Sequence, residues 1–151
     1  MPVWRTIVAV VLAVTWTEAS LQQPPRDGRP LRQTAVALLT QGHDSYKAKN
    51  WQKAIDRYEA ALAADRATFT AYFFLANSYD NLYDASRATN RPDRRHLLKA
   101  VEHYRNAAAR ETDPDVQKRA AEYLAAAYGP DKLNDPAEAQ AIHRDMDVKA
   151  R

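Results

Sequence analysis

Residues 51–62 read WQKAIDRYEAAL, and their apolar members fall at the spacing i, i+3, i+4, i+7, i+10 and i+11. Residues 72–83 (YFFLANSYDNLY) and 97–108 (LLKAVEHYRNAA) repeat that spacing. It places the apolar side chains on one face of an α-helix. Because each stripe mixes alanine with large aromatic or branched residues, helices can pack closely in pairs, and such pairs bury their stripes by stacking on neighbouring pairs. The pattern therefore predicts an all-α fold built from stacked helix pairs.

The composition agrees with one helical domain and excludes several functional classes. The 151 residues include only three glycines, too few for a turn-rich β fold, and no stretch alternates like a series of strands. The absence of cysteine excludes disulfides and thiolate metal sites. The net charge of +3 is mild, whereas nucleic-acid binding usually requires a stronger and more clustered positive field. We therefore expect no nucleic-acid partner.

The first residues have the layout of a secretory signal peptide. A short basic start precedes the apolar run 7–16, and small residues then suit cleavage after Ala19. The run is about half of the ~20 residues that span a bilayer, although an uncleaved anchor is the alternative. We predict a signal peptide at 1–19, export to a bacterial periplasm or cell envelope or beyond the cell, and no stable membrane span after cleavage.

The rest of the chain divides into a leader and a helical domain. Residues 20–33 (SLQQPPRDGRPLRQ) are rich in proline and polar residues, which predicts a flexible leader before a folded domain at 34–151. Asp113-Pro114 and Asp135-Pro136 are helix start signals, and Gly129-Pro130 ends a helix. The expected helices are 34–48, 51–64, 69–85, 93–110, 115–128 and 136–149.

These residues resemble the tetratricopeptide repeat family, whose unit is a 34-residue helix–turn–helix. The chain shares the family's small, aromatic and alanine positions, and Gly42 and Ala76 are one 34-residue period apart. The resemblance, which extends to exported bacterial members, implies a right-handed α-solenoid of about three units at 35–68, 69–114 and 115–151. The motif residues are Leu38, Gly42, Ala54, Tyr58 and Ala61; Tyr72, Leu75, Ala76, Tyr79, Ala100, Tyr104 and Ala107; and Ala121, Leu124, Ala125, Tyr128 and Ala139.

The resemblance also implies a binding site. In this family the first helix of each unit lines a concave groove that holds a peptide or helix of another protein. Asn77 falls where members often hold a peptide backbone, and Phe73 replaces the basic residue of members that clamp a terminal carboxylate. Phe73 is then either an aromatic anchor or ordinary packing between repeats, and Asn77 either a ligand or a solvated side chain. The candidate groove residues are His43, Tyr46, Lys47, Phe73, Asn77, Asp80, Asn81, Arg119 and Glu122.

An insertion interrupts the second unit. Tyr79 and Ala100 are 21 residues apart where the first unit's geometry implies nine, so about twelve extra residues lie at 85–96 (ASRATNRPDRRH). We expect either a basic loop that engages phosphate, lipid head groups or an acidic protein patch, or a solvated connector. Its four arginines are Arg87, Arg91, Arg94 and Arg95.

The sequence contains no recognisable catalytic or phosphate-binding motif. The four histidines are expected at the surface, and Asp80 and Asp84 on a solvated helix face. We therefore expect a non-catalytic, cofactor-free protein–protein interaction scaffold. The alternative is a self-assembling structural module or part of a longer repeat array, because an exposed stripe around Ile142 and Met146 would favour a homo-oligomer.

Overall fold

The computed structural model describes residues 29–89 and 91–149, and all regular secondary structure in this part is α-helical. The predicted signal peptide at 1–19, and the predicted leader as far as residue 28, lie outside the described residues. Among the described helices, none is both long and apolar enough to cross a membrane. The helices are α1 (Arg29–Lys47), α2 (Trp51–Ala64), α3 (Thr70–Arg87), α4 (Arg94–Arg110), α5 (Pro114–Ala127) and α6 (Pro136–Lys149).

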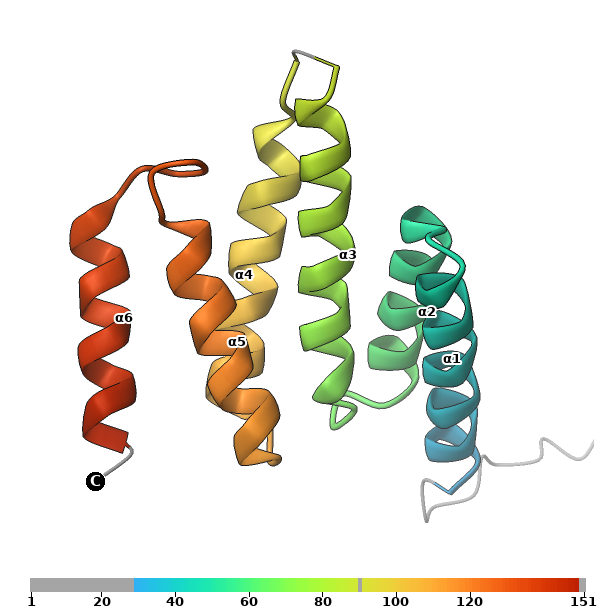
Figure 1. Ribbon diagram of the computed structural model, residues 1–151. Helices are drawn as coiled ribbons and strands as arrows, with labels where there is room; N and C mark the ends of the chain where they lie inside the picture. Colours follow the sequence, from blue (N-terminus) through green and yellow to red (C-terminus); the bar gives the residue numbers. More distant parts are fainter. Residues whose placement is uncertain (1–28, 90, 150–151) are drawn as a thin grey trace, which may run out of the picture.

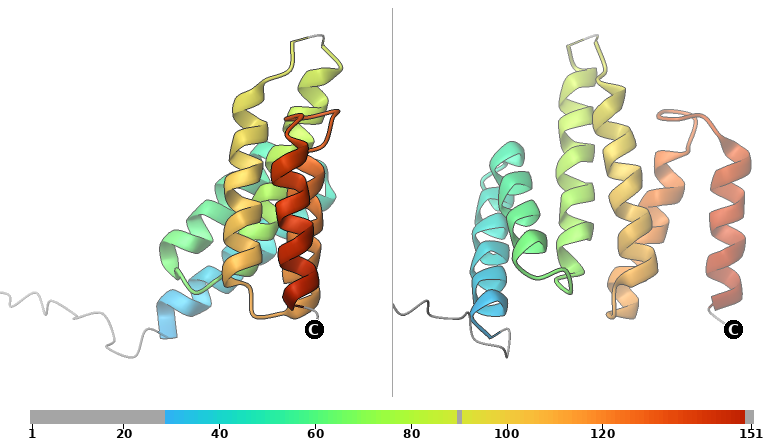
Figure 2. Two further views of the ribbon diagram at one scale, coloured as in Figure 1. Left: turned by 90° about the vertical axis from the view of Figure 1, so that its left-hand side faces the viewer. Right: turned by 180° about the vertical axis from the view of Figure 1, so that it is seen from behind.

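The six helices pack in chain order as antiparallel pairs, which is consistent with a helical repeat array (Figure 1). Helices α1, α3 and α5 lie on one side of the array, and α2 and α4 lie on the other (Figures 1 and 2). The backbones of α1 and α3, and of α3 and α5, approach within 8 Å between Cα atoms, whereas those of the described parts of α2 and α4 do not. The array is thus tighter on the side of α1, α3 and α5, which we call the odd-helix face.

The predicted apolar stripes form the core. Two clusters of buried residues follow the chain, one centred on α2 and the start of α3, the other on α3, α4 and α5. The stripe residues that are buried are Ala54, Ile55, Tyr58 and Ala61; Leu75, Ala76 and Tyr83; and Leu97, Ala100, Val101, Tyr104 and Ala107. The remaining stripe residues are half-buried at the edges of these clusters: Trp51, Leu62, Tyr72, Tyr79, Leu82 and Ala108.

Gly42 lets α1 approach α2. It is buried in the middle of α1, opposite the fully buried ring of Tyr58. A Cβ atom at Gly42 would lie 2.4 Å from Cε1 and 2.6 Å from Cδ1 of Tyr58, much closer than non-bonded carbon atoms allow. The absence of a side chain at this position therefore makes room for the tyrosine.

The start of α1 differs from the prediction. The helix begins at Arg29, five residues before the expected start at Thr34, so residues 29–33 are helical rather than part of a flexible leader. Pro30 is compatible with a first helical turn, where no backbone N–H is needed for helix hydrogen bonds. The side chains of residues 30–34 are all exposed, which is why apolar periodicity gave no sign of this extra turn.

The insertion at 85–96 lies largely within two helices, close to the expected helices 69–85 and 93–110. Helix α3 continues to Arg87 and α4 begins at Arg94, so only residues 88–93 connect them. The added residues mostly lengthen the helices: α3 ends 11 residues after Ala76, whereas α1 ends five after Gly42, and α4 has 17 residues against 14 in α2. The α3–α4 hairpin consequently projects beyond the neighbouring pairs (Figure 1). Of the four arginines, only Arg91 lies in the connection.

Candidate binding face

The odd-helix face carries aromatic and polar side chains from three successive helices. Tyr46 comes from α1, Asp80 and Asn81 from α3, and Tyr123 from α5. The Tyr123 side chain is 47% exposed, and Tyr46 is half-buried. Burial raises the pKa of the Tyr46 hydroxyl. The helices that carry these side chains contact each other, α1 with α3 and α3 with α5, so the side chains belong to one face.

Tyr104 reaches this face from α4. Its ring is fully buried and stacks on Tyr123 with 5.6 Å between ring centroids and 13° between planes. Its hydroxyl donates to Oδ1 of Asn77 at 2.8 Å, and Nδ2 of Asn81 donates to the Asn77 carbonyl oxygen at 2.7 Å. The side-chain oxygen of Asn77 already has a donor, so Asn77 is not simply the solvated side chain of one reading, and its role as a peptide ligand stays a prediction.

Asp80 is paired with a distant lysine. Its carboxylate accepts a hydrogen bond from Nζ of Lys132, which lies 52 residues away in the connection between α5 and α6. The two side chains are only 16% and 17% exposed. The expectation of a solvated carboxylate was therefore wrong for Asp80. The sequence carried no local signal for a contact over this separation.

Phe73 belongs to the packing between helices. It is 6% exposed, and its ring meets those of Phe74, Tyr104 and Tyr123 at centroid distances of 5.5 to 6.4 Å. The Arg119 guanidinium lies 5.6 Å from its centroid and covers it. Phe73 is therefore unavailable as an aromatic anchor, and packing was the correct alternative.

Tyr123 is the exposed aromatic residue on this face, and the sequence reasoning missed it. It lies four residues after the predicted Arg119, so the i, i+4 spacing of a helix face could have included it. Two predicted residues are also exposed: Lys47 at the end of α1, and Glu122 next to Tyr123 on α5. An aromatic anchor at the odd-helix face is thus offered by α5 rather than by α3.

His43, His96 and His103 are less exposed than the sequence suggested, whereas His143 is exposed as expected. The ring of His43 lies 4.3 Å from Phe74 and 5.6 Å from Tyr58, and its Nε2 is buried with no partner in the part of the chain that the structure describes. His103 stacks on the rings of Tyr72 and Tyr79 at 6.0 and 5.6 Å. Burial lowers the pKa of both imidazoles. Within the described chain, no three acidic or histidine side chains gather to hold a metal ion.

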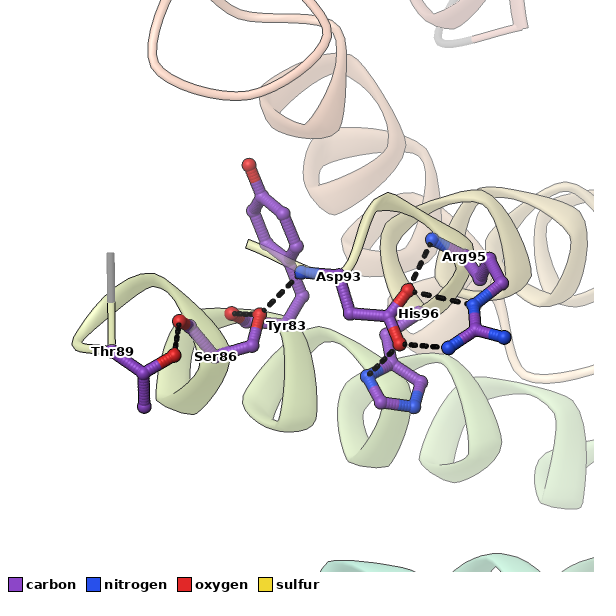
Figure 3. Close-up of polar contacts among 6 residues, drawn as sticks. All are labelled: Tyr83, Ser86, Thr89, Asp93, Arg95 and His96. Carbon is purple, nitrogen blue, oxygen red and sulfur yellow. Dashed lines mark hydrogen bonds and ion pairs between the residues drawn. The ribbon is translucent and has the colours of Figure 1, made fainter. Parts of the chain in front are cut away.

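Local polar contacts organise the tip of the α3–α4 hairpin (Figure 3). The Ser86 hydroxyl donates to the Tyr83 carbonyl at 2.6 Å and accepts from the Asp93 amide at 2.8 Å. The Asp93 carboxylate caps α4 by accepting from the Arg95 amide at 3.0 Å, and it binds the Arg95 guanidinium at 2.8 to 3.0 Å. Hydrogen bonds from Arg95 lower the pKa of Asp93 to about 2.

These contacts reduce the basic character of the hairpin. Arg95 is paired with Asp93, and Arg87 lies 3.7 Å from Asp84. The other two arginines, Arg91 and Arg94, are exposed. The tip is thus a capped helix connection with two of its four arginines beside carboxylates.

A cavity of about 450 Å³ separates parts of α5 and α6. None of the described α6 side chains is fully buried, and Ile142 and Met146 are half-buried rather than openly exposed. The packing of α6 on the array is therefore loose. The apolar residues that line the cavity are Ala108, Pro114, Ala121, Leu124, Ile142 and Met146.

Comparison of the sequence with models of known protein families, and with curated proteins, gives no match. What the protein binds must therefore be inferred from its own surface.

Proposed function

We propose that this protein is a non-catalytic interaction scaffold that binds a peptide or helical segment of another protein along its odd-helix face. The observation that carries the proposal is the half-exposed ring of Tyr123 on α5, which stacks on Tyr104, whose hydroxyl donates to the side-chain oxygen of Asn77 on α3. A surface of this kind suits a segment laid across the helices, because aromatic rings provide apolar contact area and amide groups can bond a peptide backbone.

We further propose that the array is a right-handed tetratricopeptide solenoid. The support is the packing of the first helix pair, which has a partial counterpart in the second. In the first pair a small residue on the odd helix, Gly42, faces the fully buried Tyr58 on the following helix. Ala76 and Tyr104 belong to one buried cluster in the second pair. In the third pair the aromatic position is taken by His143, which is exposed, in keeping with the looser packing of α6.

The proposed location is the periplasm or cell envelope, reached through the signal peptide at 1–19. The support is the order of basic, apolar and small residues at the start of the chain. Intact-mass measurement of the protein recovered from a bacterial periplasm should give a chain that begins at Ser20. Recovery of a membrane-bound chain that keeps Met1 would contradict cleavage.

Two matched substitutions test the binding face. Tyr123→Ser removes the exposed aromatic ring of α5, and Leu98→Ser removes a side chain of α4 that is 55% exposed. Proteins captured from an envelope extract should be lost with Tyr123→Ser and kept with Leu98→Ser, provided that both variants keep the wild-type melting temperature. Capture that is equal with both variants would place the binding surface elsewhere. Phe73 and Asn77 are unsuitable targets, because their side chains hold helices together.

Self-assembly is the second candidate function, and the surface around α6 favours it. The cavity between α5 and α6 has mainly apolar walls, and Val148 near the end of α6 is 73% exposed. A second copy of the chain, or a further unit of a longer array, could cover this surface. Sedimentation equilibrium over a wide concentration range should then show a dimer that dissociates on dilution. A monomer at every concentration would exclude this candidate.

A further inference from the structure

The ion pair between Asp80 and Lys132 lies at the proposed binding face, and its position suggests a specific kind of partner. Asp80 projects from α3 and Lys132 from the α5–α6 connection, and both side chains are largely withdrawn from water. We infer that Asp80 and the tyrosines around it form a receptor for a lysine side chain of the partner segment, and that Lys132 occupies this receptor when no partner is bound. The inference rests on the proposed function and names the chemistry that the face selects.

The groups around Asp80 suit an ammonium ion. The Tyr104 hydroxyl donates to Asn77, which lies about one turn before Asp80 on α3. Burial, and to a smaller extent the Asp80 charge, raises the pKa of the phenols of Tyr104 and Tyr46. Tyr123 stacks on Tyr104 and is 47% exposed. A carboxylate supplies a charge-assisted hydrogen bond, and aromatic rings attract a cation at their faces.

The neighbouring charges are already engaged elsewhere. Asp84, one turn after Asp80 on α3, lies beside Arg87. Arg119 on α5 lies over the ring of Phe73. In the described part of the chain, Lys132 is therefore the cation that neutralises Asp80, and it shows directly that a primary ammonium group fits there.

Lys132 can leave this position without unfolding the connection that carries it. Backbone hydrogen bonds hold the connection independently: the amides of Leu133, Asn134 and Asp135 donate to the carbonyls of Ala127, Gly129 and Tyr128 at 2.9 to 3.1 Å. The lysine side chain itself has a flexible four-carbon stem. Displacement is thus a movement of one side chain.

Replacement of Lys132 by a lysine of the partner would also make the face selective for lysine-containing segments. A partly buried carboxylate left without a cation is costly, so a neutral or acidic segment that displaced Lys132 would leave Asp80 unpaired. A lysine from the partner restores the same hydrogen bond and charge balance. Lys132 belongs to the same chain and therefore competes for Asp80 at a high effective concentration. Partner segments that bind weakly or carry no charge cannot displace it.

A titration followed by ¹H–¹⁵N NMR spectra of the purified protein tests the inference. The probe is a short glycine–serine peptide with two lysines, and the matched control peptide has glutamine in their place. The lysine peptide should shift the amide signals around Asp80 and Lys132, and the glutamine peptide should not. Lys132→Met should bind the lysine peptide about tenfold more tightly, because in the wild type Lys132 occupies the receptor for most of the time. Asp80→Asn should abolish the shifts.

The control variant is Lys118→Met, which removes an exposed lysine of α5 that lines the cavity beside α6. It should bind the peptide like the wild type. If Lys132→Met does not fold, Lys132→Gln keeps a polar side chain at the same position and takes its place. Equal affinity in the wild type and the Lys132 variant, or shifts that persist in Asp80→Asn, would overturn the inference.

The failure of this inference is distinguishable from failure of the proposed function. Capture of a protein that is lost with Tyr123→Ser and kept with Asp80→Asn would refute the lysine receptor while leaving the binding face intact. Capture that neither substitution affects would refute both.

Discussion

The hydroxyl group of Tyr104 on α4 donates a hydrogen bond to Oδ1 of Asn77 on α3, with 2.8 Å between the two oxygen atoms. The bond joins a ring that is fully buried in the core to an amide group on the odd-helix face. It thereby fixes the position of α3, which also carries Asp80 and Asn81, against the second helix of the same pair. The packing of the core and the shape of the proposed binding face are coupled through this contact.

Tyr104→Phe should lower the free energy of unfolding by about 1 kcal/mol, because it deletes one buried hydrogen bond and leaves the Asn77 oxygen without its donor. Urea denaturation measures the change. In a double-mutant cycle, Asn77→Ala should cost clearly less in the Tyr104→Phe background than in the wild type. The control is Tyr72→Phe, since the Tyr72 hydroxyl makes no hydrogen bond to described residues. Equal costs for Asn77→Ala in both backgrounds would mean that the contact does not contribute to stability.

Gly42→Ala should destabilise the protein by about 1–3 kcal/mol, because the new methyl group would overlap the Tyr58 ring and force α1 and α2 apart. A loss of stability would be diagnostic, since alanine in a helix interior is otherwise more favourable than glycine by about 1 kcal/mol. The matched control is Gln41→Ala at the exposed neighbouring position, which should change the melting temperature little. Thermal unfolding by circular dichroism compares the two variants. A Gly42→Ala protein as stable as the control would disprove the close approach of α1 and α2.

The protein should lose stability between about pH 10 and pH 12. The Tyr79 hydroxyl donates to Oε1 of Glu59 at 3.1 Å, and burial, with the Glu59 charge, raises the pKa of Tyr79 from 10.0 to about 12. Because the folded state keeps this proton longer than the unfolded state, the stabilisation is complete below pH 10 and is lost as pH rises through 12. Burial also raises the pKa of Tyr46, Tyr58 and Tyr104, which adds to the effect in the same direction.

Denaturation at a series of alkaline pH values, together with phenolate absorbance, checks this dependence. Tyr79→Phe should make the loss of stability shallower, because the variant has one fewer proton to release. A variant with the same alkaline slope as the wild type would show that Tyr79 titrates normally.

Asp93→Ala should loosen the hairpin tip more than Asp93→Asn does. Both substitutions remove the ion pair with Arg95, but asparagine can still accept a hydrogen bond from the Arg95 amide at the start of α4. Hydrogen exchange should therefore accelerate most at the first turn of α4 in the alanine variant. The first turn of α5, capped in the same way by Asp113, serves as the internal reference and should be unaffected.

Acid titration provides a second readout for Asp93. Its pKa in the folded state is about 2, below the ordinary value of 3.8. The stabilisation is therefore present above pH 3.8 and is lost as pH falls through 2. Local exchange at the α4 start that does not change over this range would argue against the Arg95 contact.

Local signals in the sequence were sufficient for the helices and the core. Stripes such as Ala54–Tyr58–Ala61 repeat within a few turns of one helix, and the structure buries all three of these residues. Asp113 caps α5, and the Asp135 carboxylate accepts from the Glu138 amide at the start of α6, as the sequence indicated. The length of α1 was underestimated, because its first turn is exposed and contributes no apolar pattern.

The exposure and the partners of the predicted binding-face residues could not be predicted in the same way. Helical spacing assigns a residue to a face of its helix, but it does not say what covers that face. Phe73 and Tyr123 both face the region between α3 and α5, yet Phe73 is buried beneath Arg119 and Tyr123 remains half-exposed. Asn77 was placed on the correct helix face, but its acceptor is taken by a tyrosine 27 residues further on.

The sequence by itself determined six helices, the caps of α5 and α6 and the buried stripes, because these depend on spacings and hydrogen bonds within one or two turns of the chain. The tertiary structure alone decided which polar groups meet on the odd-helix face. The pairing of Asp80 with Lys132 spans 52 residues and depends on how closely α3 and α5 approach. That approach is set by the volumes of many packed side chains together, such as Phe73 of α3 against Tyr123 of α5, and no local pattern specifies it.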